Sequence, residues 1–245
     1  MSYVYFLPLI VLDIVLGVSA PRSNVPDVGP YYYYYVNNWQ CERSEYWPML
    51  WDDTGERGEP GPQCDGHNLL ILNEPELSGQ SNVSPVDAAA LVNKWANWDG
   101  PLWCCGNQHS DEGWTWFGEF VHHYESASGA PPPLTGIHLH AYSGGRYDVA
   151  ELERWRKLAD SYGWQIAVTE FGPWPHGRTA EQIAAELPTM IEQVTEALHP
   201  SYLFWFAWHV LPGDAWENMS LYDADGKITP VGTAWYGLQA GTERQ

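Results

Sequence analysis

The sequence has little positive charge. Only 11 of its 245 residues are Lys or Arg, against 31 Asp and Glu, which gives a formal net charge of −20. Nucleic acids and anionic membrane surfaces are bound through clustered Lys and Arg, so this composition argues against both as partners. A neutral polymer would not be repelled by such an acidic surface.

Cysteine is also scarce, with four in the chain. No CxxC or Cys/His spacing suggests a zinc site. Cys41 and Cys64 flank a polar loop rich in Gly and Pro, which a disulfide between them would bridge. For the neighbours Cys104 and Cys105 we expect no mutual bridge, because adjacent residues meet disulfide geometry only with strain.

The apolar N-terminal stretch falls short of a membrane span. It runs over Phe6–Ala20, is interrupted by Asp13, and is shorter than the roughly 20 apolar residues that a spanning helix needs. Its small-residue ending is typical of a secretory signal and favours a secreted protein, although no Lys or Arg precedes it. The alternative is a first core strand, Leu16–Ala20. Residues 1–20 are therefore expected to be a signal-like segment or to include the first strand.

Aromatic residues, in contrast, are abundant, with 15 Trp and 15 Tyr. Such rings either fill a core or line a groove in which their flat faces stack on sugars. We expect many of them to line a groove, because the Trp ring combines a large apolar area with an N–H that can donate a hydrogen bond.

Short, nearly continuous apolar runs recur along the chain, as is typical of strands covered on both faces in a parallel sheet. Eight runs qualify: Leu16–Ala20, Tyr31–Val36, Trp47–Trp51, Leu69–Leu72, Leu102–Cys105, Gly136–His140, Gln165–Thr169 and Tyr202–Ala207. Capping signals place helices at about 85–98, 114–126, 148–162, 179–198 and 232–238. Strands and helices alternate only in the second half. The pattern predicts an α/β fold, a single catalytic (β/α)8 TIM barrel over residues 16–245 with reduced helices in its N-terminal half.

Two carboxylates follow strands of this expected barrel, at the end where barrel enzymes carry their chemistry. Glu74 follows the fourth strand and Glu170 the seventh. A retaining glycosidase needs two carboxyl groups about 5–5.5 Å apart, one to protonate the leaving oxygen and one to attack the sugar. Either Glu alone is better explained as the first exposed residue of a loop, but the pair favours catalysis. Glu76 is a rival acid only if Glu74 is buried.

The contexts of the pair, Asn73-Glu74-Pro75 and Thr169-Glu170-Phe171-Gly172, resemble clan A of the retaining β-glycosidases. The resemblance implies that Glu74 is the general acid/base, that Asn73 contacts the sugar 2-hydroxyl, and that Glu170 is the nucleophile. Glu74 would then need a raised pKa, to which burial and the negative charge of Glu170 would both contribute.

A longer ordered set of motifs is similar to glycoside hydrolase family 128. The set is Tyr34-Tyr35-Val36-Asn37-Asn38-Trp39, Trp47–Trp51, Leu70–Pro75, His138–Tyr142 and Val168–Gly172. The resemblance spans roughly Leu16 to Leu238 and implies a small barrel with endo-β-1,3-glucanase activity. The chain departs from this family at two places: Asn37-Asn38-Trp39 replaces an expected Tyr-Asn-Trp, and Cys104-Cys105 stands where small residues or Pro are expected.

Three polar side chains on or after the sixth strand extend the candidate site. His138 and His140 alternate with apolar residues and so point to one side, where they are expected to hydrogen-bond catalytic groups or substrate. The Tyr142 phenol is placed to hold the nucleophile ionised. A metal-binding His-x-His is the alternative, but metal-dependent barrel hydrolases carry this motif on the first strand, and the first strand here has none. We expect no metal and no cofactor.

The remaining candidate substrate-binding residues lie at or near strand ends: Asn38, Trp39, Trp51, Trp174, Trp205 and Trp208. The expected partner is a β-glucan polysaccharide or oligosaccharide, bound by a monomer. Another clan A activity (cellulase, mannanase or xylanase) and a non-catalytic glycan-binding barrel remain alternatives. A non-catalytic barrel would be expected to lack one of the two carboxylates, but Glu74 and Glu170 are both present.

Overall fold

The computed structural model describes residues 14–19, 32–34, 41, 46–55, 58–143, 147–174, 177–206 and 216–242. Eight strands occur in these ranges, one at each predicted position. They are β1 (Val15–Ser19), β2 (Tyr32–Tyr34), β3 (Tyr46–Leu50), β4 (Leu69–Ile71), β5 (Leu102–Gln108), β6 (Gly136–Ser143), β7 (Gln165–Pro173) and β8 (Tyr202–Trp205). The near-continuous apolar runs therefore identified every strand, although β5, β6 and β7 extend several residues further than predicted.

Strands that are consecutive in sequence are also neighbours in the sheet. The pairs are parallel throughout, and β1 pairs with both β2 and β8, so the strand order closes on itself. The sheet thus curls into a barrel-like shape whose strands all end at the same mouth.

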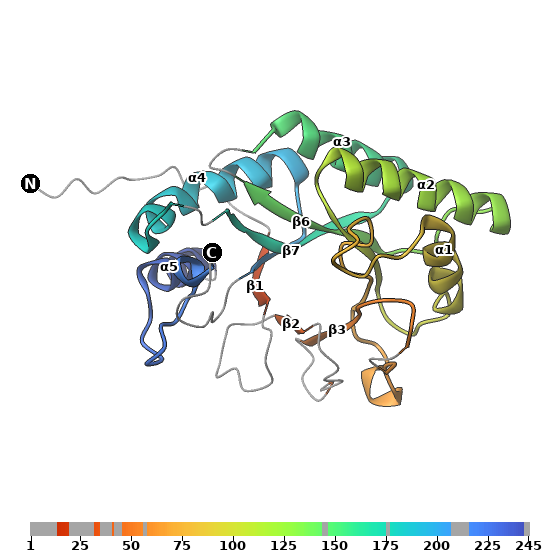
Figure 1. Cartoon of the computed structure of the whole chain (residues 1–245), viewed down its shortest axis with the longest axis horizontal. Helices are drawn as coiled ribbons and strands as arrows, with labels where there is room; N and C mark the ends of the chain where they lie inside the picture. The colour runs from red at the N-terminus through yellow and green to blue at the C-terminus, as the bar shows by residue number, and fades with distance from the viewer. Residues whose placement is uncertain are drawn as a thin grey trace, which may run out of the picture.

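Five α-helices follow the last five strands in the described part of the chain. They are α1 (Pro85–Lys94), α2 (Asp111–Ser128), α3 (Val149–Tyr162), α4 (Ala180–Leu198) and α5 (Pro230–Thr242). Helices α1 to α4 form an arc outside β6 and β7, whereas β2 and β3 lie on the opposite side (Figure 1). Between β1 and β4, the one helix in the described segments is the 3-10 helix η1 (Pro62–Cys64). The fold is therefore α/β and barrel-like, but in these residues it lacks the eight helices of a complete (β/α)8 barrel. None of the helices described is long and apolar enough to span a bilayer.

The helix boundaries follow from capping groups that the sequence displays. The Ser84 hydroxyl accepts a hydrogen bond from the backbone N–H of Asp87, and Thr179 forms a capping box with Gln182. Helix α3 ends at Gly163, whose φ of 71° is accessible to glycine at little cost. These signals confirm the predicted starts of α1 and α4 and the predicted end of α3, whereas α2 begins at Asp111, three residues before its predicted start.

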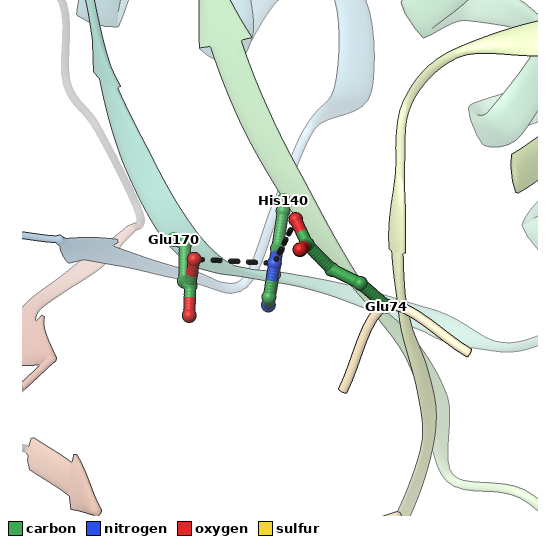
Figure 2. Close-up of side chains that lie close together, drawn as sticks. All are labelled: Glu74, His140 and Glu170. Atoms are coloured by element: carbon green, nitrogen blue, oxygen red, sulfur yellow. Dashed lines mark hydrogen bonds and ion pairs between the residues drawn. The ribbon is translucent and has the colours of Figure 1, made fainter. Parts of the chain in front are cut away.

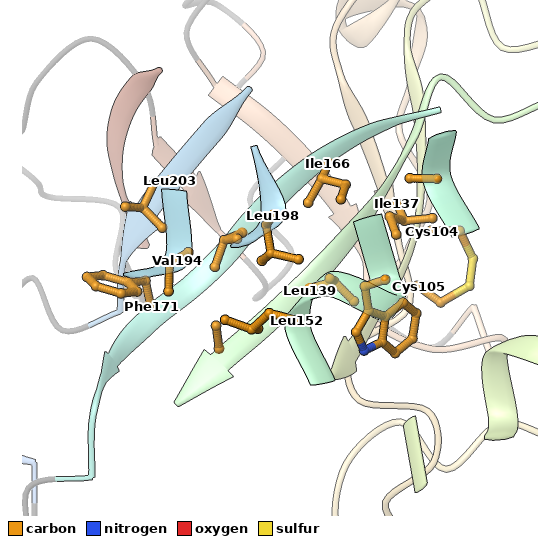
Figure 3. Packing of buried hydrophobic residues seen from close by; sticks show 14 of the residues in the cluster. Cys104, Cys105, Ile137, Leu139, Leu152, Ile166, Phe171, Val194, Leu198 and Leu203 are labelled. Atoms are coloured by element: carbon orange, nitrogen blue, oxygen red, sulfur yellow. A yellow bond between two sulfur atoms is a disulfide. The ribbon is translucent and has the colours of Figure 1, made fainter. Parts of the chain in front are cut away.

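Two apolar layers stabilise the barrel. The outer layer lies between strands and helices and includes Leu139, Ile166 and Leu198 (Figure 3). The inner layer fills the barrel with Trp47, Met49, Leu70, Trp103, Ala167 and Phe204. Trp47 stacks on Trp103 with ring centroids 5.3 Å apart. The barrel floor is therefore filled, which leaves the mouth for polar side chains.

The expectation that many tryptophans line a groove is wrong for the largest buried ones. Trp47, Trp103, Trp155, Trp205 and Trp235 are all fully buried. Their rings fill the barrel interior or the layer between strands and helices.

Both cysteine pairs form disulfides. Cys41 is bonded to Cys64, as the sequence suggested. Cys104 is bonded to Cys105, which corrects the expectation that these neighbours do not bridge. Their peptide bond is cis and their Cα atoms lie 3.1 Å apart.

Candidate active site

The two carboxylates reach the barrel mouth by different routes. Glu74 lies three residues beyond β4, in a turn where Leu72 and Glu74 themselves have positive φ values of 66° and 44°. Such values are uncommon for residues with a Cβ and are often found at functional sites. The backbone N–H of Glu74 donates to the carbonyl of Gly106 on β5, at 3.0 Å, which fixes the turn against the neighbouring strand.

Glu170 lies inside β7 rather than after it, because β7 continues to Pro173. The register between β6 and β7 shifts here: Leu139 faces Val168, but His140 faces Glu170, so Thr169 is the extra residue. A bulge of this kind re-aims side chains. Thr169 and Glu170 both contact histidines of β6, although adjacent residues of a regular strand point to opposite faces.

One imidazole nitrogen connects the two carboxylates. The Nδ1 atom of His140 lies 3.1 Å from Oε1 of Glu74 and 3.2 Å from Oε2 of Glu170 (Figure 2). The Tyr142 hydroxyl donates a hydrogen bond to the same Oε2. The structure thus brings together four of the predicted site residues, from β4, β6 and β7.

Mutual electrostatics set the protonation of this group. Burial alone would lower the pKa of His140, but the negative charges of Glu170 and Glu74 and the hydrogen bond to Glu74 raise it. Burial alone would raise the pKa of Glu74, but the hydrogen bond and charge of His140 and a hydrogen bond from Gln108 lower it. The expected raised pKa of Glu74 is therefore not found, because the sequence argument omitted the imidazolium between the carboxylates.

The same three side chains contain the atoms of a possible metal site. One ligand atom each from Glu74, His140 and Glu170 lie within 4.8 Å of one another. The separations of 3.1 and 3.2 Å around Nδ1 are those of hydrogen bonds. A proton on that nitrogen accounts for the geometry.

His138 lies deeper in the barrel than the sequence suggested. Its Nε2 lies 3.0 Å from the carbonyl of Ile71 and its Nδ1 lies 3.1 Å from the hydroxyl of Thr169. Burial lowers its pKa to about 3, so the neutral ring donates from Nε2 and accepts at Nδ1. Both nitrogens are thus used within the protein, which corrects the prediction that His138 binds substrate; the ring instead joins β4, β6 and β7.

Asn73 remains a candidate for binding substrate. Its side chain is buried, its amide donates to Oε1 of Gln80 at 3.2 Å, and its Oδ1 has no hydrogen-bond partner in the described residues. A buried oxygen of this kind is unusual in proteins unless a ligand or water satisfies it.

An aromatic group lies next to Tyr142. Trp174, just beyond β7, is 38% exposed, and its ring centroid lies 5.1 Å from that of Tyr142 and 5.2 Å from that of Trp216. Trp216 also lies 5.1 Å from Phe206. Sequence reasoning named Trp174 but missed Trp216, which follows no predicted strand.

The other predicted aromatic positions differ in their surroundings. Trp205 is fully buried and its indole N–H donates to the carbonyl of Met219, so the prediction that it binds substrate is wrong: the ring packs in the outer layer. Trp51 is partly exposed and packs against the inner layer. Asn38, Trp39 and Trp208 lie outside the described residues.

Two further side chains at the mouth have contacts that the sequence did not predict. Gln108 donates from Nε2 to Oε1 of Glu74 at 3.0 Å. The carboxylate of Glu76 accepts from the backbone N–H of Gln108 and from the Asn107 amide. Glu74 is buried, which was the condition for considering Glu76 as the acid instead. Both oxygens of Glu76 are, however, engaged by Asn107 and Gln108. The predicted fifth strand ended at Cys105, three residues too early; a strand that continued to Gln108 would have placed this side chain at the mouth.

Comparison with known proteins gave structural and family matches, but no curated protein matches the chain. A family 128 (subgroup II) endo-β-1,3-glucanase from Pseudomonas viridiflava superposes with a TM-score of 0.67 at 22% identity, covering 90% of this chain and 96% of that one. A subgroup I endo-β-1,3-glucanase from Amycolatopsis mediterranei, in complex with laminaritriose, gives a TM-score of 0.67 at 19% identity over 91% and 98% of the two chains. A subgroup VI exo-β-1,3-glucanase from Aureobasidium namibiae gives 0.66 at 14% identity over 91% and 96%.

At these identities the structural likeness establishes the fold. The family follows from the sequence itself, since the model of the glycosyl hydrolase catalytic core matches residues 24–236. The chain therefore belongs to the glycosyl hydrolase catalytic core family.

Proposed function

We propose that this glycosyl hydrolase is a retaining endo-β-1,3-glucanase, with Glu74 as general acid/base and Glu170 as nucleophile. One observation carries the proposal: oxygens of these two buried carboxylates, from β4 and β7, lie within 4.8 Å of each other. Inverting glycosidases separate their carboxyl groups by about 6.5–9.5 Å to admit a water, whereas retaining enzymes keep them about 5–5.5 Å apart. The short separation favours retention.

In the first step, a carboxylate oxygen of Glu170 bonds to the anomeric carbon while the bond from that carbon to the leaving oxygen breaks. Glu74 gives its proton to the leaving oxygen. In the second step, Glu74 takes a proton from water, whose oxygen displaces Glu170 and leaves a sugar of retained configuration. A bound sugar excludes water from Glu74 and so strengthens the burial effect that raises its pKa toward that of a working acid.

Neighbouring side chains support these roles. The Tyr142 hydroxyl donates to Glu170 and favours its anionic form. The buried Oδ1 of Asn73 is suited to accept from a sugar hydroxyl. The aromatic group of Trp174 and Trp216 offers flat faces beside the nucleophile.

The choice of β-1,3-glucan rests on the similar structures. Those from Pseudomonas viridiflava and Amycolatopsis mediterranei are described as endo-β-1,3-glucanases, and the latter holds laminaritriose. A net charge of −20 is compatible with a neutral glucan. The similar exo-β-1,3-glucanase makes chain-end cutting the alternative to test first.

We extend the proposal to the whole chain: residues 16–245 form one catalytic unit, a (β/α)8 barrel whose helices are reduced in the N-terminal half and which acts as a monomer. The closed strand order supports it. We also propose that the protein is secreted. Its two disulfides support this, because disulfides persist mainly in oxidising compartments.

Product analysis on three glucans tests the proposed function. Laminarin and curdlan should release a ladder of oligosaccharides, and carboxymethylcellulose should release none. Release of single sugars or one short product from laminarin would show exo cutting. Activity on carboxymethylcellulose, mannan or xylan alone would assign another clan A activity. Binding to laminarin without new reducing ends would show a glycan-binding barrel.

A further inference from the structure

Gln108 is the last residue of β5, and its side-chain amide contacts Glu74. The strand reaches this position through a bulge: Cys105 faces His138 and Asn107 faces Leu139, so Gly106 is the extra residue. Gly106 has a φ of 68°, and a Cβ there would lie 2.9 Å from both the His138 ring and the Leu72 carbonyl. Only glycine fits this bulge without displacing its neighbours.

Glu76 holds the end of β5 in place. Its Oε1 accepts from the backbone N–H of Gln108 at 2.7 Å, and its Oε2 accepts from the Asn107 amide at 2.9 Å. Both carboxylate oxygens of Glu76 therefore bind the last two residues of the strand. Charge-assisted bonds of this kind are among the stronger hydrogen bonds in proteins.

The two oxygens of Glu74 have different surroundings. Oε1 lies 3.0 Å from Nε2 of Gln108 and 3.1 Å from Nδ1 of His140. Oε2 makes no hydrogen bond with the described residues. The Gln108 amide nitrogen can only donate, so it occupies a lone pair of Oε1 whether Glu74 is ionised or neutral.

We propose that Gln108 is a positioning residue, which reserves Oε1 of Glu74 as an acceptor, so that the catalytic proton is carried on Oε2, and that Glu76 holds Gln108 in this place. The inference rests on the proposed acid/base role of Glu74. With both donors directed at Oε1, a proton on that oxygen would lose a hydrogen bond. Oε2 is then the oxygen that delivers the proton to the leaving group.

The substitution Gln108→Met tests this role, because it keeps the length of the side chain and removes the donor. Hydrolysis of laminarihexaose, whose leaving group needs protonation, should slow about 10- to 100-fold. Hydrolysis of 2,4-dinitrophenyl β-laminaribioside, whose leaving group departs without a proton, should change less than threefold in its glycosylation rate. The exposed Gln63, changed to Met, serves as the matched control and should leave both rates unchanged.

The pH profile gives a second readout. The Gln108 hydrogen bond lowers the pKa of Glu74, so its loss should move the basic limb of kcat/KM to higher pH. Glu76→Gln, which turns one acceptor into a donor and so frees the end of β5, should likewise slow hydrolysis of laminarihexaose more than that of the dinitrophenyl glycoside. If Gln108→Met lowers stability too far for assay, Gln108→Glu should move the basic limb up as well, because its carboxylate repels that of Glu74.

Equal losses on both substrates, or an unmoved basic limb, would overturn the inference while leaving the proposed function intact. An inactive wild-type enzyme would instead reject the proposed function itself.

Discussion

The imidazole Nδ1 of His140 lies 3.1 Å from the carboxylate Oε1 of Glu74, inside the barrel mouth. The same nitrogen reaches Glu170 at 3.2 Å. Two carboxylates this close repel each other strongly when both are ionised in a buried site. A single imidazolium between them removes most of this repulsion, which explains how both are accommodated with 5% exposure each.

Tyr142→Phe should weaken catalysis without unfolding the protein. The substitution removes the hydroxyl that donates to Glu170 and keeps the ring that packs against Trp174. Loss of one hydrogen bond to a charged group predicts a fall in kcat/KM of about 10- to 100-fold. The matched control is Tyr162→Phe, which removes a hydroxyl bonded to Glu125 on the outer surface and should leave the rate unchanged. Equal rates for wild type and Tyr142→Phe would contradict the role.

Trp174→Ala should weaken substrate binding more than it lowers the rate of the catalytic step. Its ring is 38% exposed beside Tyr142, and stacking on a sugar is a contact made equally in ground and transition states. KM for laminarihexaose should rise about tenfold with kcat nearly unchanged, the size expected from ~1.5 kcal/mol of aromatic contact. Trp174→Phe keeps a flat ring and should retain most of the affinity. An unchanged KM for the Ala variant would exclude a substrate contact at this ring.

His138 predicts a specific loss of stability in acid. Its pKa is about 3 in the folded protein, against roughly 6.5 in an unfolded chain. As the pH falls below about 6.5, the unfolded chain binds a proton there and the folded protein does not, so the free energy of unfolding decreases until about pH 3. The difference is on the order of 5 kcal/mol.

Chemical unfolding of wild type and His138→Gln between pH 7 and pH 4 measures this effect. Gln keeps a donor for the Ile71 carbonyl but does not take up a proton, so the variant should lose less stability over this interval. The exposed His122, changed to Gln, is the control and should follow the wild type. Parallel stability curves for His138→Gln and wild type would show that His138 is not the group responsible.

The sequence was sufficient for the strand order and for the two carboxylates. Strands buried on both faces leave continuous apolar runs, so β4 and β7 were counted correctly and Glu74 and Glu170 were assigned to the mouth. The starts of α1 and α4 were predictable because caps such as Ser84 are local signals.

The details of the site depended on features without a local signal. The bulges at Gly106 and Thr169 shift the register by one residue, and this shift directs Gln108 and Glu170 to their partners. Whether a tryptophan at a strand end faces sugar or core, as for Trp205, depends on the tertiary packing around its ring. The lowered pKa of Glu74 required the position of His140, which only the folded barrel supplies.

The most direct measurement of the central claim is azide rescue of Glu170→Ala and Glu74→Ala on 2,4-dinitrophenyl β-laminaribioside, with the anomeric configuration of the glycosyl azide read by NMR. Azide that replaces a nucleophile attacks the substrate itself and inverts its configuration, whereas azide that acts in place of the acid/base intercepts the glycosyl-enzyme and retains it. Our account predicts the α-azide from Glu170→Ala and the β-azide from Glu74→Ala. The opposite pairing, or full wild-type hydrolysis by either variant, would contradict it.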